Sequence, residues 1–336
     1  MIFWVEASQN IGMGHLKESI YLADYFRSHN YLIYFIINPY LPAELALQNK
    51  KIEYLTTEIN HYDKIVHLIK KKSHHRCIII NHWNVSFNAL EILHQENFFV
   101  VVIDHLGNKS VLCDVLINRS IVPEWLKYEF VQNTPVCCFG SDYAILDDAY
   151  EALHKCEKKF STVNNSILVS MGGVDRSGAT LRIIEALKFV NISSKIIILG
   201  PGFPLLEKLK QIRMKLNNNT FHFFQGINNL GEMMQKADIV ISAGGNTLYE
   251  MACIGTPGIV LWEDQHEYIL GKTFSEKGVA LCLGNGMSIP EKDITRNIHE
   301  LLKNIDRRKD MSQCGKKLID YKGRNRIMHK IKALIG

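Results

Sequence analysis

Short apolar runs alternate with amphipathic stretches over the first third of the chain. The apolar runs have the length of buried strands and lie at 2–6, 32–37, 77–80 and 98–103. The stretches between them have apolar residues at helical spacing and lie at 14–28, 62–71 and 87–95. This repeated strand–helix order predicts an α/β fold with a parallel sheet that is buried on both faces.

The pattern weakens between about 119 and 160 and then begins again. Strands are expected at 166–170, 195–199, 220–224, 239–242 and 258–261. Helices are expected at 178–190, 205–216, 230–236 and 246–254. The polar stretch 157–165 is interpreted as a linker between an N-terminal domain, 1–156, and a C-terminal domain, 166–336, whose tail helix could pack back. The sequence thus predicts two Rossmann-like domains that face a central cleft, where such folds bind ligands.

Composition narrows the class of protein. The 336 residues carry 39 Lys and Arg against 34 Asp and Glu, and 47% are hydrophobic, which is ordinary globular usage. The chain has neither an apolar run of the roughly 20 residues that span a bilayer nor the features of a signal peptide. The eight cysteines form no CxxC pair, so we expect reduced thiols in a cytoplasmic protein, with no zinc site.

The small excess of positive charge, +5, is concentrated in two segments, 70–76 and 316–332. We interpret the first as a solvated helix end, and a patch for a membrane surface or an acidic ligand is the minority alternative. No segment resembles a nucleic-acid-binding module.

Three glycine-rich turns follow an expected strand and precede an expected helix. They are Gly12-Met13-Gly14-His15, Met171-Gly172-Gly173-Val174-Asp175 and Ser242-Ala243-Gly244-Gly245-Asn246-Thr247. Glycine allows the backbone to approach a ligand closely, and a helix N-terminus offers N–H groups to an anion. Plain turn chemistry explains any single turn, but three in the same topological position favour a phosphate-bearing ligand. None is a P-loop or a clean dinucleotide fingerprint, so NAD is disfavoured.

His15 opens the helix that follows the first strand. An isolated histidine is more often structural than catalytic, but this one lies where α/β folds place their ligands. The ordinary pKa of histidine, near 6.5, suits a general base at neutral pH.

Several segments resemble the PseG-type nucleotide-sugar hydrolases, which act on UDP-2,4-diacetamido-2,4,6-trideoxy-altrose in pseudaminic acid synthesis. The opening Gly12-Met13-Gly14-His15 with Leu22-Ala23 resembles their Gly-x-Gly-His-x-x-Arg...Leu-Ala motif. The similarity continues through 78–83, 103–105, 113–118, 140–146, 169–175, 237–250 and 263–265. The last segments are also similar to MurG-like glycosyltransferases.

The resemblance implies a GT-B-like fold that binds a nucleotide diphospho-sugar without a metal ion or another cofactor. His15 would activate water for attack on the anomeric carbon, and UDP would leave. On the sugar side, the implied residues are Gly14, Lys17, Asn81, Trp83, Asp104, Ser141 and Tyr143. On the nucleotide side they are Gly172, Gly173, Asp175, Ser242, Ala243, Gly244, Gly245, Asn246, Thr247, Glu250, Glu263 and Gln265. Of these, Glu250 would accept hydrogen bonds from ribose, and Gln265 would contact the phosphate–sugar region.

The departures from the family pattern cluster on the sugar side. Asn81-His82-Trp83 stands where the hydrolases have Asp-x-Tyr, and Trp83 has no phenolic proton although its ring can stack on a sugar. Lys17 is taken as the counterpart of the family arginine. Asp147 stands where an arginine is usual, and Asp104-His105 replaces an Asp-Asp pair.

Three functions therefore stay open. The first is hydrolysis of a nucleotide sugar, and the second is transfer of the sugar to an acceptor hydroxyl that His15 deprotonates. The third is a binding protein that has lost turnover. An exposed apolar segment at 39–47 would favour a membrane-bound acceptor, but we expect a core-facing helix there. We expect a monomer or weak dimer.

Overall fold

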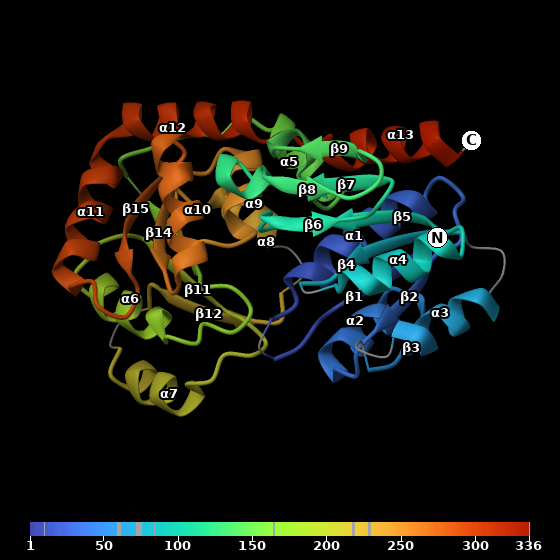
Figure 1. The fold of residues 1–336 in the computed structure, drawn as a ribbon. Coiled ribbons are helices and arrows are strands. Elements are labelled where there is room, and N and C mark those ends of the chain that lie inside the picture. The colour runs from blue at the N-terminus through green and yellow to red at the C-terminus, as the bar shows by residue number, and fades with distance from the viewer. Residues whose placement is uncertain are drawn as a thin grey trace. The chain divides into compact units, whose positions relative to one another are not determined.

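The computed structural model describes residues 1–9, 11–58, 62–71, 76–83, 85–163, 165–216, 219–227 and 230–335. The chain forms two compact units (Figure 1). Unit 1 comprises Met1–Asp148 and Tyr321–Gly336, and unit 2 comprises Ala149–Asp320.

The core of unit 1 is a parallel sheet in the order β3-β2-β1-β4-β5-β7-β9. Its strands are β1 (Ile2–Val5), β2 (Tyr34–Ile37), β3 (Glu53–Thr56), β4 (Cys77–Asn81), β5 (Phe99–Ile103), β7 (Val115–Asn118) and β9 (Val136–Phe139). The apolar strands expected from the sequence are present, and their neighbours in space bury both faces of the sheet.

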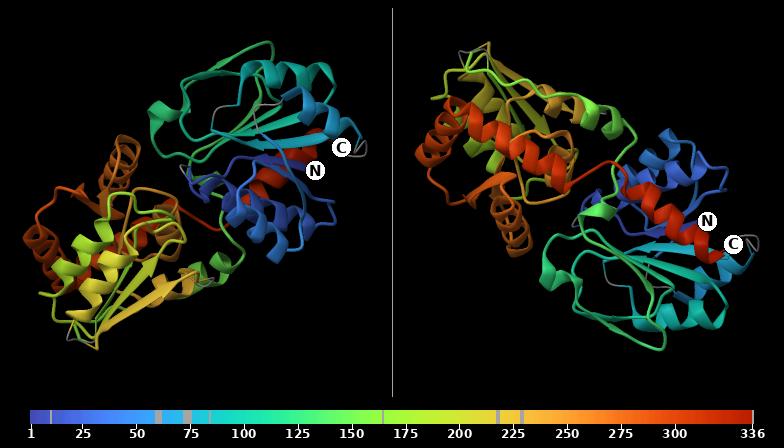
Figure 2. Two further views of the ribbon diagram at one scale, coloured as in Figure 1. Left: turned by 90° about the horizontal axis from the view of Figure 1, so that it is seen from below. Right: turned by 90° about the horizontal axis from the view of Figure 1, so that it is seen from above.

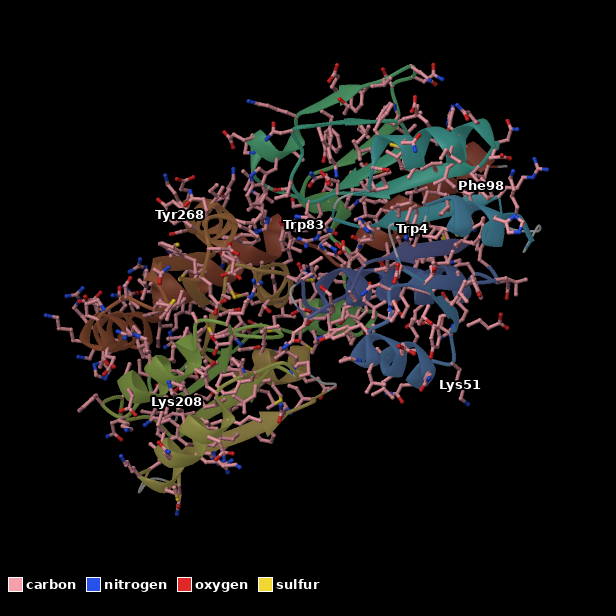
Figure 3. All side chains as sticks on the ribbon, turned by 60° about the horizontal axis from the view of Figure 1, so that its bottom comes forward. Trp4, Lys51, Trp83, Phe98, Lys208 and Tyr268 are labelled. Carbon is pink, nitrogen blue, oxygen red and sulfur yellow. The ribbon has the colours of Figure 1, made fainter. Side chains whose placement is uncertain are left out.

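Side chains alternate between the two faces along each strand of unit 1. Phe3 and Val5 point into one apolar cluster, which α1 (Gly14–Arg27), α2 (Leu41–Asn49) and α13 (Gly323–Ile335) cover. Ile2 and Trp4 point into the other, which α3 (Tyr62–Lys71) and α4 (Phe87–Gln95) cover. Figure 3 shows Trp4 inside these layers, whereas Lys51 projects from the surface.

Short elements lie within and just before the region where the sequence pattern weakens. They are β6 (Lys109–Val111), the 3₁₀ helix η1 (Pro123–Leu126), β8 (Tyr128–Phe130) and the 3₁₀ helix η2 (Ser141–Tyr143). β6 and β8 pair in parallel as a separate ribbon. Three-residue strands carry too few positions for a detectable period, so no clear pattern is present in this part of the sequence.

The tail of the chain belongs to unit 1. Helix α13 packs Ile327, Met328 and Ile331 into the same cluster as α1, and it lies along the first elements of the chain (Figure 2). Gly323 lies so close to the backbone of Ala144 that a Cβ atom would come within 2.0 Å of its carbonyl oxygen. Arg324 forms an ion pair with Asp148, the last residue of the first segment of unit 1.

Unit 2 has a parallel sheet in the order β12-β11-β10-β13-β14-β15. Its strands are β10 (Ser166–Ser170), β11 (Ser194–Leu199), β12 (Phe221–Gln225), β13 (Ile239–Ser242), β14 (Gly258–Trp262) and β15 (Ala280–Asn285). Its helices are α5 (Ala149–Lys155), α6 (Ala179–Leu187), α7 (Leu206–Met214), α8 (Leu230–Lys236), α9 (Thr247–Ile254), α10 (Gln265–Glu276), α11 (Glu291–Lys303) and α12 (Ile305–Leu318).

The polar stretch 157–165 lies within unit 2, and the first change of unit comes earlier, between Asp148 and Ala149. Lys158 is buried, and its Nζ donates to the carbonyl oxygens of Gln235 (2.5 Å) and Ala237 (2.6 Å) at the end of α8. Buried charges need such partners, so this segment is anchored although its composition resembles a linker. Residue 164 lies outside the described residues.

Helix α2 is only partly core-facing. Ala43 and Leu47 are buried, as expected for this segment, but Leu41 and Leu45 are 67% and 47% exposed. The helix is short, and its apolar residues extend beyond the face that the core covers.

Of the basic segment at 70–76, Lys70 is exposed and pairs with Glu96, while 72–75 lie outside the described residues. Within the part of the chain that the structure describes, no helix combines the length and the apolar character needed to cross a membrane.

Candidate functional site

Each sheet has a point at which the chain reverses its direction of winding. In unit 1 this point lies between β1 and β4, and in unit 2 it lies between β10 and β13. Ligands of open α/β sheets bind outside the carboxyl ends of the strands at such points. The three glycine-rich turns follow β1, β10 and β13, so all three border a switch point.

His15 is the centre of the unit 1 site. It is the second residue of α1, whose N-cap residue, Met13, makes no side-chain capping hydrogen bond. Its ring is stacked between two others: the centroid of Trp83 is 5.5 Å away and that of His105 is 4.8 Å away. The interplanar angles are 17° and 13°, so the three rings are nearly parallel. His15 is 8% exposed, whereas Trp83 is 36% exposed.

The surroundings keep His15 neutral at pH 7. Burial, with His105 as the next cause, lowers the pKa of His15 to about 3, although Glu18 acts in the opposite direction. Its Nδ1 atom is buried and has no hydrogen-bond partner among the described residues. A neutral imidazole with an unused nitrogen can accept a proton or bind a water molecule.

Glu18 is the acidic centre of the same cluster. Its carboxylate lies 2.7 Å from Nε of Arg119 and 3.3 Å from Nε2 of His105. Burial would raise the pKa of Glu18, but Arg119 and then His105 lower it below its ordinary value. Sequence reasoning named neither Glu18 nor Arg119. The one available signal for Glu18 was that an acidic residue stands beside the expected buried positions of an amphipathic helix.

The fold brings Asn81 into this cluster, as the resemblance implied. It ends β4 and is fully buried, and its Nδ2 donates to the carboxylate of Glu18 at 3.2 Å. The next residue, His82, lies with Nδ1 3.5 Å from the carboxylate of Glu6. Burial, with Lys109 as a second cause, lowers the pKa of His82 to about 4.

Lys17 is an exposed residue of α1 and makes no contact with this cluster in the described structure. The motif His-x-x-Arg, counted from His15, reaches Glu18 and not Lys17, so the assignment of Lys17 to the arginine position is wrong by one residue. The position therefore carries the opposite charge, and Arg119 supplies the cation from another strand end.

Three other sugar-side residues lie in separate contacts. The carboxylate of Asp104 accepts from the backbone N–H of Gly107 (2.7 Å) and from Tyr128 (2.7 Å), and it pairs with Lys109. These contacts hold the carboxylate in place, and a substrate contact of Asp104 stays a prediction. Ser141 and Tyr143 form η2 after the edge strand β9, where Tyr143 packs against the cluster that contains α13.

In unit 2, the turn after β10 depends on close backbone approach. Gly172 has a φ of 83°, a conformation that favours glycine. A Cβ on Gly200, at the end of β11, would lie 2.3 Å from the carbonyl oxygens of Gly172 and Gly173. A Cβ on Gly172 or Gly173 would meet no atom within 4 Å, so the turn is open on its outer side.

Asp175 does not face outward from this turn. Its carboxylate accepts from the backbone N–H of Ala179 (2.9 Å) and Thr180 (3.0 Å), the first residues of α6. Glu263 is similarly engaged, because it accepts from the hydroxyl of Ser177 at 2.6 Å. Asp175 thus caps the N-terminus of α6 and Glu263 contacts the same turn, and the nucleotide contacts of both residues stay predictions.

The turn after β13 leads into helix α9. Asn246, the N-cap residue of α9, makes no side-chain capping hydrogen bond. Ser242, Ala243 and Gly244 are buried, and a Cβ on Gly244 would lie 2.3 Å from the carbonyl oxygen of Glu267. Gly245 has open space around it. Among the turn's predicted residues, those nearest solvent are Gly245, Asn246 and Thr247.

Two further predicted nucleotide-side residues lie in the first turns of α9 and α10. Glu250 lies partly buried in the first turn of α9, and Gln265 is the exposed first residue of α10. Asp264 caps α10 through the N–H of Glu267. Glu267 itself was not predicted: it accepts from the N–H of Glu263 at 2.8 Å, and burial raises its pKa to about 7.

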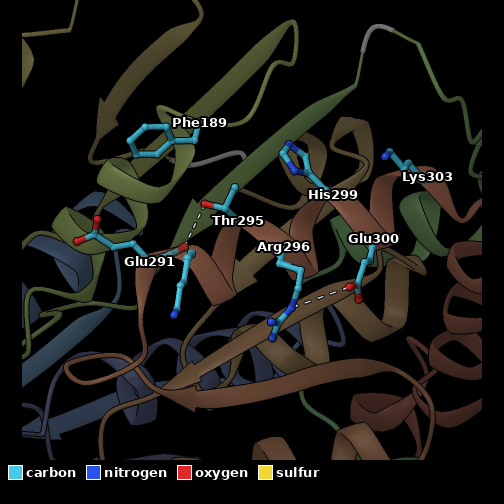
Figure 4. A pocket seen from close by; sticks show the side chains of 8 residues that line it. Phe189, Glu291, Thr295, Arg296, His299, Glu300 and Lys303 are labelled. Carbon is cyan, nitrogen blue, oxygen red and sulfur yellow. Dashed lines mark hydrogen bonds and ion pairs between the residues drawn. The ribbon is translucent and has the colours of Figure 1, made fainter.

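A groove of unit 2 lies elsewhere. It has a volume of about 740 Å³ (Figure 4). It is lined by Phe189, Glu291, Lys292, Thr295, Arg296, His299, Glu300 and Lys303. None of these eight was predicted from the sequence. Among the described residues, no group of three or more His, Cys, Asp or Glu side chains could hold a metal ion.

Comparison with known proteins gives relatives in sequence. Residues 183–327 match the family model of the glycosyltransferase family 28 C-terminal domain. The chain is 27% identical over 231 residues to the spore coat polysaccharide biosynthesis protein SpsG of Bacillus subtilis, covering 68% of this chain and 67% of that protein. It is 26% identical over 251 residues to the UDP-2,4-diacetamido-2,4,6-trideoxy-beta-L-altropyranose hydrolase of Campylobacter jejuni, covering 72% and 84% respectively.

Solved structures give the fold. MurG of Acinetobacter baumannii is similar with a TM-score of 0.70 and 12% identity over 99% of both chains. The spinosyn rhamnosyltransferase SpnG, complexed with thymidine diphosphate, is similar with a TM-score of 0.67 and 11% identity over 98% of this chain and 99% of that one. The chain is therefore an α/β protein of GT-B-like fold with two Rossmann-like units, related to proteins of nucleotide-sugar chemistry.

Proposed function

We propose that the protein hydrolyses a UDP-linked acetamido-deoxy sugar to free sugar and UDP, a reaction of nonulosonic-acid biosynthesis. The observation that carries this proposal is the neutral, buried imidazole of His15 at the switch point of unit 1, stacked between Trp83 and His105. The similarity to the Campylobacter hydrolase over 72% of the chain supports it.

In this reaction His15 accepts the proton of a water molecule as its oxygen attacks the anomeric carbon. The bond between that carbon and the phosphate oxygen breaks, and UDP leaves with the bonding electrons. A base with a pKa near 3 is weak, but an anionic group of the substrate close to it would raise that pKa, because opposite charge favours the imidazolium. Substrate binding would thus prepare the base.

The nucleotide is assigned to the turn after β13. The N-terminus of α9, at Gly245, Asn246 and Thr247, would hold the diphosphate through backbone N–H groups and the helix dipole. Gly172 and Gly173 would border the ligand, and Glu250 and Gln265 would contact ribose and phosphate. Asp175 and Glu263 act by holding the neighbouring turn.

A glycosyltransferase is the second candidate, and one observation favours it. The exposed Leu41 and Leu45 of α2 give unit 1 apolar surface of the kind that a membrane-bound acceptor would use. The family 28 match agrees with this alternative. The two functions share His15 as base and differ only in whether water or an acceptor hydroxyl attacks.

The test is incubation of the purified protein with UDP-, GDP- and CMP-linked sugars, with and without candidate acceptors, followed by NMR. Free sugar formed without an acceptor supports the hydrolase. Nucleotide release that requires an acceptor replaces it with the transferase, and tight UDP binding without any turnover indicates a binding protein.

The role of His15 has its own test. His15→Ala should lose at least ~100-fold in turnover, as expected for loss of a general base. His29→Ala is the matched control, because this exposed histidine follows the end of the same helix. Equal activity of the two variants would remove His15 from the mechanism.

A further inference from the structure

Glu18 lies one helical turn after His15 and is nearly inaccessible to solvent. It forms a buried ion pair with Arg119, whose Nε lies 2.7 Å from Oε1. The other carboxylate oxygen, Oε2, lies 3.3 Å from Nε2 of His105. Buried ion pairs are expensive to desolvate and add little net stability, so this pair calls for another explanation.

Asn81 fixes the direction of the hydrogen bonds in this cluster. Its Nδ2 lies 3.2 Å from three acceptors: the carbonyl oxygen of His15, Oε2 of Glu18 and Oγ of Ser19. The amide nitrogen must therefore be on that side, which turns Oδ1 toward His105. The distance from this oxygen to Nε2 of His105 is 3.3 Å.

Nε2 of His105 thus faces two oxygen acceptors, one on Glu18 and one on Asn81. A ring nitrogen between two acceptors carries the hydrogen, so the contacts select the tautomer that is protonated on Nε2. They also fix the ring about its χ2 angle, because both acceptors are themselves buried and held. The fixed ring is the one that stacks on His15 at 4.8 Å.

We propose that Glu18 is a positioning residue for His15: with Asn81 it holds Nε2–H of His105, and the fixed His105 ring holds the imidazole of His15 for proton transfer. The proposal rests on the hydrolase function. Glu18 touches no reacting atom, and Arg119 balances its charge, so the arrangement orients the ring without adding net charge beside the base.

The experiment compares two double variants that both remove the ion pair. Glu18→Gln/Arg119→Met keeps an acceptor for His105 at residue 18. Glu18→Leu/Arg119→Met removes that acceptor, together with the Oε2 contact that helps to hold the Asn81 amide in its orientation, and leaves Asn81 Oδ1 alone beside His105. Removing both charges avoids leaving either one buried alone. The control, Asp24→Leu/Arg27→Met, removes an exposed ion pair from the same helix.

Two readouts are measured at pH 7: the tautomer of His105, from the ¹⁵N shifts of its ring nitrogens, and kcat and KM for the sugar nucleotide. The Leu variant should lose the Nε2–H tautomer as the sole form and lose ~10–100-fold in kcat, with KM and UDP affinity unchanged. The Gln variant should keep the tautomer and lose far less in kcat.

The proposal is overturned if the Leu variant retains both the tautomer and kcat, or if both variants lose kcat equally and in step with their melting temperatures. If the Leu variant does not fold, the wild-type protein still decides, because a His105 protonated on Nδ1 contradicts the proposal. A wild-type protein that binds UDP but turns over no sugar nucleotide would contradict the hydrolase function instead. The tautomer of His105 does not depend on turnover, so its measurement separates the two failures.

Discussion

The two switch points differ in how their buried carboxyl groups are held. In unit 1, burial would raise the pKa values of Glu18 and Asp104, but Arg119 and Lys109 lower them below their ordinary values. In unit 2, burial raises the pKa of Asp175, with Glu263 adding to the effect, and raises that of Glu267 to about 7.

This difference separates two ways of building a site. In unit 1, cationic side chains pair with the buried carboxylates and hold the side chains in fixed positions, as a base requires. Unit 2 holds its carboxyls with backbone N–H groups, and groups with raised pKa values can be neutral when an anion approaches. A diphosphate would therefore meet less repulsion there than the number of acidic residues suggests.

The largest effect is expected from breaking the charge balance in unit 1. Arg119→Met leaves the carboxylate of Glu18 buried without its cation and should lower the free energy of unfolding by about 3–5 kcal/mol. Urea unfolding at pH 7 measures it. Glu18→Gln/Arg119→Met should recover most of the lost stability. If Arg119→Met alone were as stable as the wild type, Arg119 would not be needed to balance the charge of Glu18.

The backbone-built turn of unit 2 is tested by two neighbouring glycines. Gly244→Ala places a Cβ 2.3 Å from the carbonyl oxygen of Glu267 and should cost about 1–3 kcal/mol, with UDP affinity reduced at least ~10-fold. Gly245→Ala meets no atom within 4 Å and should change stability by less than about 0.5 kcal/mol. Denaturant unfolding and calorimetric UDP titration give both quantities, and equal stabilities would refute the close approach at Gly244.

The titration of Glu267 tests the difference between the two units in the pKa values of their buried carboxyl groups. Its folded-state pKa, about 7, lies above the ordinary 4.5, so its contribution to stability is present below pH 4.5 and is lost as the pH rises through 7. Between pH 5 and pH 8, the wild type should lose on the order of 1 kcal/mol relative to Glu267→Gln. If the stabilities of the two proteins changed with pH in parallel, the raised pKa of Glu267 would be refuted. The depressed carboxyls of unit 1 predict the opposite sign, with stability lost as the pH falls through their folded-state pKa values.

The smallest effect concerns the stack over His15. Trp83→Ala uncovers one face of the imidazole, and because burial is the main cause of its low pKa, that pKa should rise by about 0.5–1 unit. The acid limb of the activity profile should then move to higher pH, which pH–rate measurements detect. Trp83→Phe keeps an aromatic ring over His15 and should shift the limb less.

Local pattern was enough to predict most of the central strands of both sheets. β1, β4, β5, β10 and β13 lie within a residue or so of their expected bounds, because a buried parallel strand needs a continuous apolar run. The positions of the glycine-rich turns before the helices were also predicted correctly. The short elements between 109 and 143 and the division at Asp148 were not, because they depend on contacts and not on a period.

The candidate site divides in the same way. His15, Asn81 and Trp83 come together as the motifs implied, since β1 and β4 are neighbours in the sheet. Glu18 and Arg119 were missed because 101 residues separate them along the chain. The capping of α6 by Asp175 was not predicted, because a carboxylate after a glycine turn can face a ligand or cap its own helix, and only the backbone path decides which.

By itself, the sequence determined the order of strands and helices and the positions of the three glycine-rich turns, because these features are encoded within a few neighbouring residues. Tertiary structure alone decided which charges meet and which carboxylates accept from backbone N–H groups. Those outcomes depend on strand order, which places the ends of β1 and β4 side by side and brings Arg119 to Glu18.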